Sequence, residues 1–329
     1  MKIFVTGGAG FIGSHLVRRL LKEGNEVAVL DNLSTGSLDN IADVLENPAL
    51  SFTEGDVCDK ELTLKLSSGC QQMYHLAAAV GVKLIIDRPI HTIKTNIYGS
   101  EVMLETAQEH GAKLLIASTS EVYGKTEKVP FCEEDDTIYG STTHPRWAYA
   151  CSKAVDEFLS LAYYRQTGLK VLVARFFNTI GPGQTGRYGM VVPRFIDSAL
   201  KNEPITVYGS GKQSRCFGAV WDVIRAADML MTSDDSFGEV YNIGNDKPIT
   251  IMQLAERIIE LTGSKSEIVL VPYEKAYGKD FDDMMVRQPS LEKVSGKTGF
   301  KPEYSLDMIL REMIEYQQRK NEHFFENAL

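Results

Sequence analysis

Short apolar runs alternate with helical segments through the first half of the chain. The runs read as buried strands at KIFVT (2–6), EVAVL (26–30), QMYHLAA (72–78), KLLIAS (113–118) and KVLVARF (170–176). Strands that are apolar throughout, separated by helices, are typical of a parallel sheet covered on both faces. The pattern therefore predicts an α/β, Rossmann-type doubly wound fold.

Three segments between these runs have helical spacing. Residues 14–24 place Leu16, Val17, Leu20 and Leu21 on one face and end at a glycine. The segments 90–111 and 147–168 are longer, and we expect helices there as well.

The sequence pattern changes after residue 178, where a loop rich in Gly, Thr and Pro begins. We expect a strand followed by a loop over 205–215, a further strand of the first sheet at 239–244 and a closing helix near the C-terminus. The predicted first domain is 1–177, with 216–262 returning to it. A smaller C-terminal α/β domain would comprise 178–215 and 263–329, interleaved with the first.

Composition excludes several classes of partner. The chain has 329 residues and a net charge of −9, which makes nucleic acid an unsuitable ligand. Five cysteines without CxxC spacing favour reduced thiols, and neither Cys nor His shows metal-ligand spacing. No run is long enough for a membrane span, and the apolar start is too short for a signal peptide, so we expect a cytoplasmic protein.

A glycine-rich loop follows the first strand and opens the first helix. TGGAGFIG carries Gly7, Gly10 and Gly13, which would let the backbone approach a pyrophosphate at the helix N-terminus. Asp31 ends the second strand and would accept hydrogen bonds from a ribose, favouring NAD over NADP. The candidate cofactor-binding set of this region also includes Phe11, Ile12, Asn32, Asp56 and Val57.

Tyr149 and Lys153 stand four residues apart on a predicted helix, so they share one face. The lysine ammonium and a nicotinamide cation would lower the pKa of the tyrosine toward neutral pH. The tyrosinate could then remove a proton from a substrate alcohol. Ser118 and Thr119, at the end of a strand, could bond the same substrate oxygen.

Together, the glycine loop, the Ser/Thr strand end and YxxxK resemble the extended short-chain dehydrogenase/reductase family, over nearly the whole chain. The resemblance implies bound NAD, a nucleotide-sugar substrate and a C-terminal sugar-nucleotide domain. It also implies a homodimer joined through a four-helix bundle formed by the helices near 92–110 and 147–167. Further candidate cofactor-binding positions are Leu76, Ala77, Ala78 and Asn96, beside Tyr149 and Lys153.

Within this family, STSEVYG (118–124) most resembles the UDP-glucuronic acid decarboxylases. HPRWAYACSK (144–153) is similar to the segment around their catalytic tyrosine. GKQSRCF (211–217) and YGKDFDDMMVRQPS (277–290) match regions that carry an active-site arginine and a nucleotide-binding segment. These imply roles for Arg215 and Arg287. FNTIGPG resembles the diphosphate-holding loop, with Asn178 as the contact.

The implied chemistry is oxidation at C4 of a glucuronate, followed by loss of CO₂ from the β-keto acid. Thr119 and Tyr149 would serve O4, and Ser120 would position the carboxylate. Glu121 would disfavour a tightly held carboxylate, order a water or relay a proton, and Arg215 would hold substrate or supply a proton at C5. Candidate substrate-binding residues are Lys83, Asn178, Val192, Tyr208, Arg215 and Arg287.

Other interpretations remain open at this level. Glu121 could simply serve the start of a helix, and Tyr208 could stack on uracil or fill the core. The chain could be a UDP-sugar 4-epimerase acting on glucose or glucuronate. It could also be an NAD-binding regulatory protein without catalysis, although the intact Tyr149 and Lys153 argue against that.

Overall fold

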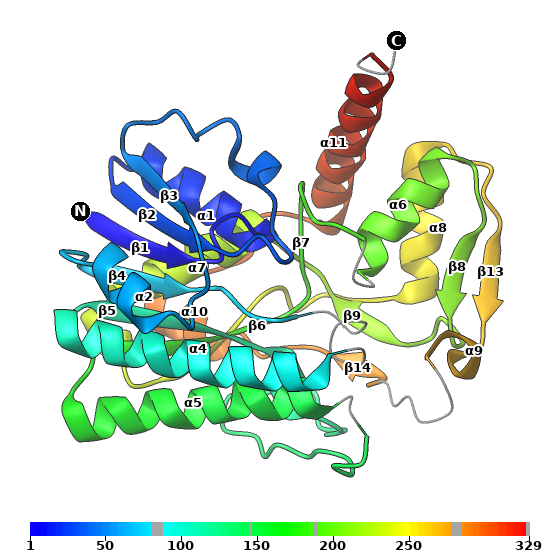
Figure 1. Cartoon of the computed structure of the whole chain (residues 1–329). Helices are drawn as coiled ribbons and strands as arrows, with labels where there is room; N and C mark the ends of the chain where they lie inside the picture. Colours follow the sequence, from blue (N-terminus) through cyan, green and yellow to red (C-terminus); the bar gives the residue numbers. More distant parts are fainter. Residues whose placement is uncertain (81–87, 145–146, 187–189, 278–283, 327–329) are drawn as a thin grey trace.

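The computed structural model describes residues 1–80, 88–144, 147–186, 190–277 and 284–326. Its centre is a parallel sheet of seven strands in the order β11-β6-β5-β4-β1-β2-β3 (Figure 1). The strands are β1 Lys2–Thr6, β2 Glu26–Asp31, β3 Leu50–Glu54, β4 Gln72–His75, β5 Lys113–Thr119, β6 Val171–Phe176 and β11 Val240–Ile243. The order reverses between β1 and β4, where an open parallel sheet forms its ligand crevice.

Helices cover both faces of this sheet because successive strand side chains point to opposite sides. Ile3 and Val5 of β1 pack against α1 Phe11–Lys22, α7 Val220–Thr232 and α10 Glu292–Thr298. Phe4 packs into a second cluster with α4 Pro89–His110, beside α2 Lys60–Leu66 and α5 Ala148–Thr167. The predicted doubly wound fold is confirmed.

The remaining elements form a smaller body with its own core. Its helices are α6 Val191–Leu200, α8 Ile251–Thr262, α9 Tyr273–Tyr277 and α11 Leu306–Glu326. β8 Ile205–Tyr208 pairs in parallel with β13 Ile268–Val271, and β9 Ser214–Cys216 lies between β12 Pro248–Thr250 and β14 Val286–Arg287. Two short strands, β7 Thr179–Ile180 and β10 Gly218–Ala219, join this body to the sheet.

Packing differs from the expected domain boundaries at two elements. We expected 216–262 to return to the sheet, but α8 places Leu254 and Ile258 in the core of the smaller body. We expected 263–329 to belong to the smaller body, but α10 buries Val294 against the sheet's core. Amphipathic spacing predicts a buried face and does not say which core covers it, so periodicity could not assign either helix.

Most predicted elements agree with the structure to within a few residues. The first helix begins at Phe11, three residues before the expected 14, because Gly10 already caps it. The strand expected at 72–78 ends at His75. The strand and loop expected over 205–215 are β8 and the turn after it, where Gly209 and Gly211 have positive φ, and a further strand, β9, begins at Ser214. Among the described residues, no helix has the length and apolar character to cross a bilayer.

Candidate active site

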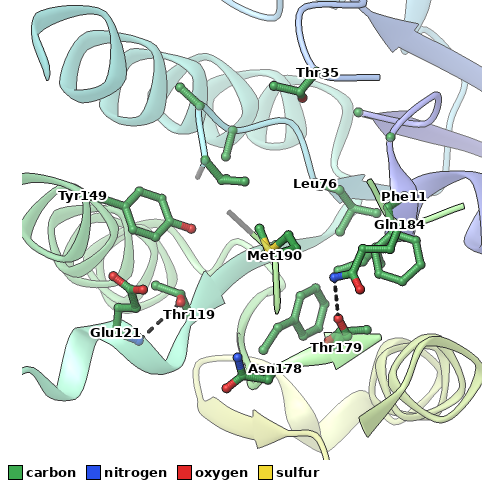
Figure 2. A pocket seen from close by; sticks show the side chains of 18 of the residues that line it. Phe11, Thr35, Leu76, Thr119, Glu121, Tyr149, Asn178, Thr179, Gln184 and Met190 are labelled. Atoms are coloured by element: carbon green, nitrogen blue, oxygen red, sulfur yellow. Dashed lines mark hydrogen bonds between the residues drawn. The ribbon is translucent and has the colours of Figure 1, made fainter. Parts of the chain in front are cut away.

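A pocket of about 590 Å³ runs along the carboxyl ends of the central strands and reaches into the smaller body. Figure 2 shows Tyr149, Thr119 and Glu121 at one end and Phe11, Leu76 and Thr35 toward the other. Residues far apart in sequence meet there because parallel strands all end at the same edge of the sheet.

The glycine loop supplies the floor of one end of the pocket. Gly7 has φ +74°, and Gly10 caps α1 without a side-chain hydrogen bond. A Cβ atom on Gly13 would lie 2.1 Å from the Gly7 carbonyl oxygen, so only glycine allows this close crossing. The helix N-terminus therefore presents its backbone N–H groups to the pocket, as an anionic diphosphate requires.

Asp31 holds this loop as well as facing the pocket. Its carboxylate accepts hydrogen bonds from the backbone N–H groups of Ala9 and Leu33, both at 2.9 Å. Burial raises its pKa, while these backbone donors oppose the shift. Asp31 lines the pocket with Asn32, so the predicted acid stands at the predicted place.

Two predicted cofactor residues support the wall of the pocket without lining it. Asp56 accepts hydrogen bonds from the Cys58 backbone at 2.9 Å and from Asn32 Nδ2 at 3.2 Å, and its neighbour Val57 lines the pocket. Asn96 is buried, accepts from the Ala79 backbone at 2.8 Å and donates to Ser152 Oγ at 3.2 Å. Both therefore orient neighbouring segments.

The other predicted cofactor residues of the sheet edge lie where expected. Phe11, Ile12, Leu76, Ala77 and Ala78 all line the pocket. They give this part of the lining an apolar character. Such a mixed cleft, with glycine backbone at one end, fits the diphosphate, riboses and rings of NAD.

The polar end of the pocket is built by the end of β5 and the start of α5. Thr119, Ser120, Glu121 and Tyr149 all line it. The Glu121 backbone N–H donates to Thr119 Oγ1 at 3.2 Å, which caps the short turn that follows β5. Lys153 does not line the pocket in this structure: it is 2% exposed and its Nζ donates to Asp156 at 2.7 Å.

Glu121 forms an ion pair with Arg287 from the smaller body. Arg287 Nη1 donates to Glu121 Oε1 at 3.2 Å, and the two side chains are only 10% and 13% exposed. The Glu121 side chain thus does more than serve the turn that begins at Ser120. We expected Arg287 only as a nucleotide contact, and the structure places it beside the candidate catalytic carboxylate.

A second arginine stands next to Arg287. Arg215 of β9 and Arg287 of β14 are register partners across a parallel pair, and both line the pocket. Each is almost fully buried. Asn178, which lies near Thr179 in Figure 2, lines the same pocket, and its Oδ1 is buried without a partner among the described residues. Two guanidinium groups and an amide suit an anion with several oxygens.

The structure also places the other substrate candidates. Val192 lies in the first turn of α6 and lines the pocket, as does Tyr208. The guanidinium of Arg194 lies over the Tyr208 ring, 4.3 Å from its centroid, so Tyr208 is a pocket wall and not core filling. Lys83 lies outside the described residues.

Several lining residues were missed by sequence reasoning. They include Arg88, Gln184, Thr185, Arg194, Gln213 and Tyr273. They lie in loops or on elements of the smaller body, where no periodic or spacing signal marks them. Only proximity to the motifs at 178–182 and 211–217 hints at Gln184 and Gln213.

The chain matches the family model described as GDP-mannose 4,6 dehydratase over residues 4–313. The chain belongs to this family. The expected resemblance to extended short-chain dehydrogenases is thereby confirmed.

Curated relatives are similar along nearly the whole chain. The UDP-N-acetyl-alpha-D-glucosaminuronate decarboxylase of Bacillus cytotoxicus is 39% identical, covering 96% of this chain and 97% of that protein. The UDP-glucuronic acid decarboxylase 1 of Danio rerio is 38% identical, covering 98% of this chain and 74% of that protein.

Solved structures agree in fold and cofactor. The UDP-glucose 4-epimerase of Thermotoga maritima, in complex with UDP-glucose, superposes with a TM-score of 0.88 at 33% identity over 98% of this chain and all of that one. The dTDP-glucose 4,6-dehydratase of Bacillus anthracis, in complex with NAD, gives 0.85 at 29% identity, covering 98% of both chains. With the glycine cradle and Asp31, these matches confirm the expectation of an NAD-dependent enzyme.

Proposed function

We propose that the protein is an NAD-dependent decarboxylase of a UDP-linked uronic acid, with UDP-glucuronate as the first candidate substrate. The observation that carries the proposal is the Glu121–Arg287 ion pair at the pocket end that also holds Tyr149 and Thr119. An alcohol oxidation at this site needs only the hydroxyl groups. A paired carboxylate and guanidinium beside them supply charge for a second step.

In the first step, Tyr149 removes the proton from the C4 hydroxyl, and Thr119 donates a hydrogen bond to O4. Bound NAD⁺ supplies the hydride acceptor. Positive charge from Lys153 lowers the pKa of Tyr149, which makes the tyrosinate available near neutral pH. Ser120 is buried beside Thr119 and positions the sugar carboxylate.

In the second step, the 4-keto uronate loses its C6 carboxylate as CO₂, and the bonding electrons pass to C5 and O4 as an enolate. Thr119 and the protonated Tyr149 stabilise the charge on O4. Glu121 disfavours a tight hold on the departing carboxylate, while Arg287 pairs with Glu121 and holds it in place. A proton then returns to C5 from Arg215, from Glu121 or from a water that Glu121 orients.

The UDP moiety would lie across the smaller body. Arg215, Arg287 and Asn178 offer charged and amide donors to the diphosphate. Tyr208, with Arg194 over its ring, forms the wall for the nucleoside.

A second candidate substrate is UDP-N-acetylglucosaminuronate, which carries an acetamido group at C2. It is favoured by the relative from Bacillus cytotoxicus, which bears that substrate in its name and aligns over almost its full length. The same two steps would apply, because the chemistry is confined to C4, C5 and C6.

The deciding experiment incubates the purified protein and NAD⁺ with each uronate separately, followed by mass spectrometry of the product and by NADH absorbance. Loss of CO₂ from one substrate supports the proposal and identifies the sugar. A pentose product with no free NADH means that the cofactor reduces the keto sugar before release, whereas a keto-pentose appears together with free NADH. A C4 epimer of unchanged mass, from these sugars or from UDP-glucose, would establish a 4-epimerase instead. NAD binding without turnover of any of them would favour a non-catalytic role.

We also infer a homodimer formed through α4 and α5. These helices pack side by side as an outer layer (Figure 1). They expose large apolar side chains, led by Ile90 at 73% and Phe158 at 74%. Burying such a face between two copies would form a four-helix bundle.

The dimer is tested by light scattering after size-exclusion chromatography. Phe158→Asp should convert the dimer to a monomer, because a charge in an apolar interface is left without a partner. Leu270→Asp is the matched control, since Leu270 is 51% exposed on β13 in the smaller body. A dimer that survives Phe158→Asp contradicts the proposed interface.

A cytoplasmic location is inferred from the five unpaired cysteines.

A further inference from the structure

Lys153 is paired with an acid that the reaction scheme does not use. Its Nζ donates to Asp156 Oδ2 at 2.7 Å, and the side chains are 2% and 0% exposed. The residues are three apart on α5, so the pair forms along the helix surface. A fully buried ion pair next to a candidate base changes the electrostatics of that base.

Spacing alone would predict a different partner for the lysine. Tyr149, Lys153 and Glu157 follow one another at intervals of four residues on the same face of α5. Glu157, however, is held by Arg175 of β6 at 2.7 Å and accepts a hydrogen bond from Ser118. Its carboxylate is thus already paired, although its charge still contributes to raising the pKa of Asp156. Asp156 is left as the anion for Lys153.

The groups that face this pair from neighbouring elements carry no competing charge. From β4, His75 is neutral, because burial, and then the charge of Lys153, lower its pKa to about 3. From α4, the hydroxyl of Ser100 lies beside the Asp156 carboxylate, and Asn96 bonds to the neighbouring Ser152. Burial raises the pKa of Asp156, and the Lys153 ammonium opposes that shift.

We propose that Asp156 is a positioning residue that keeps the buried Lys153 protonated, and thereby keeps Tyr149 able to act as the base. This inference rests on the proposed function in one respect only, namely which substrate alcohol Tyr149 deprotonates. Its physical basis is that a lysine without water or a counter-ion loses its proton, because burial penalises the charged form. A neutral lysine would no longer stabilise the tyrosinate.

The test uses Asp156→Asn in the full chain with NAD⁺ bound. Tyrosinate absorbance is titrated with pH, and the same titration of the matching Tyr149→Phe protein is subtracted to isolate Tyr149. We expect Tyr149 to titrate at higher pH in Asp156→Asn than in the parent. In turnover of whichever uronate reacts, NADH formation at neutral pH should fall about tenfold and recover as pH rises.

Asp197→Asn is the control, because it removes the same charge from an exposed Asp–Lys pair on α6. Asp197→Asn should leave unchanged both the titration of Tyr149 and the pH dependence of NADH formation. Asp156→Ser, which keeps a small hydroxyl acceptor, replaces Asp156→Asn if that protein does not fold, and the same displacement is expected. A Tyr149 titration that is unchanged, or moves to lower pH, overturns the proposal. The titration needs no substrate, so its result stands even if neither uronate is turned over and the proposed function fails.

Discussion

The two ends of the pocket are built in different ways. At the cofactor end the site is formed by backbone atoms. Gly7, Gly10 and Gly13 allow close approach of two backbone segments. Asp31 holds the loop by accepting hydrogen bonds from two backbone N–H groups. At the substrate end, side chains such as Arg215 and Arg287 reach in from separate strands. A binding site made of backbone atoms depends on one contiguous segment of the chain. A binding site made of side chains can be altered by substituting one residue at a time. This difference is consistent with a family whose solved members act on several nucleotide sugars.

The largest expected effect lies at the polar end of the pocket, where Tyr149 stands beside Thr119 and Glu121. Tyr149→Phe removes the proposed proton acceptor, so hydride transfer should slow by about 10²- to 10⁴-fold. NAD affinity should change little, because the phenyl ring retains the packing. Single-turnover NADH formation and calorimetric titration with NAD⁺ measure the two effects. Normal NADH formation would refute the assignment of Tyr149 as the base.

A single added methyl group should disrupt the cofactor end of the pocket. In Gly13→Ala the new Cβ would meet the Gly7 carbonyl oxygen at 2.1 Å, which forces the loop to move. We expect NAD affinity to fall by about two orders of magnitude, since displacements of about 1 Å can cost that much. Gly296→Ala is the control, because nothing lies within 4 Å of its added Cβ. Equal NAD affinity in both variants would show that the cradle does not hold the cofactor.

The side-chain end should respond more selectively. Glu121→Gln keeps the size of the side chain and removes its charge, so C4 oxidation should persist while CO₂ release slows by about tenfold or more. The readout is transient NADH in a rapid-mixing experiment, followed by trapped CO₂. Decarboxylation at the parent rate would remove Glu121 from the second step.

The smallest effect at neutral pH concerns a buried histidine at the end of β4. His75 bonds to Thr6 Oγ1 at 2.8 Å, and burial followed by the Lys153 charge lower its pKa to about 3. Between pH 6.5 and about 3 the unfolded chain therefore binds a proton at His75 that the folded protein does not. The contribution of the neutral His75 to the free energy of unfolding is fully present above this range. It is lost as pH falls through the range, by up to about 1.4 kcal/mol per pH unit.

Denaturant unfolding across this pH range tests the effect, with His75→Asn expected to flatten the slope. His91→Asn is the control, because His91 is exposed on α4. Equal slopes in His75→Asn and the parent would mean that another group governs acid unfolding.

Local signals explain which parts of the fold and site were predictable. Gly13, Asp31 and Tyr149 each belong to a short motif whose spacing is imposed by one turn or one helix, so sequence placed them correctly in the pocket. The contact between Glu121 and Arg287 joins positions 166 residues apart, and no periodicity encodes it. The choice of Asp156 over Glu157 as partner for Lys153 depends on Arg175, which sits on another strand. The packing of α8 and α10 likewise needed the tertiary structure.

The pairing of Arg215 with Arg287 has a consequence for the newly made chain. A ribosome delivers the glycine loop and Tyr149 well before residue 287, and N-terminal segments generally fold first. During that interval the anion-binding end still lacks one arginine and the strand that presents it. A polypeptide interrupted before β14 lacks Arg287 and therefore the guanidinium that pairs with Glu121.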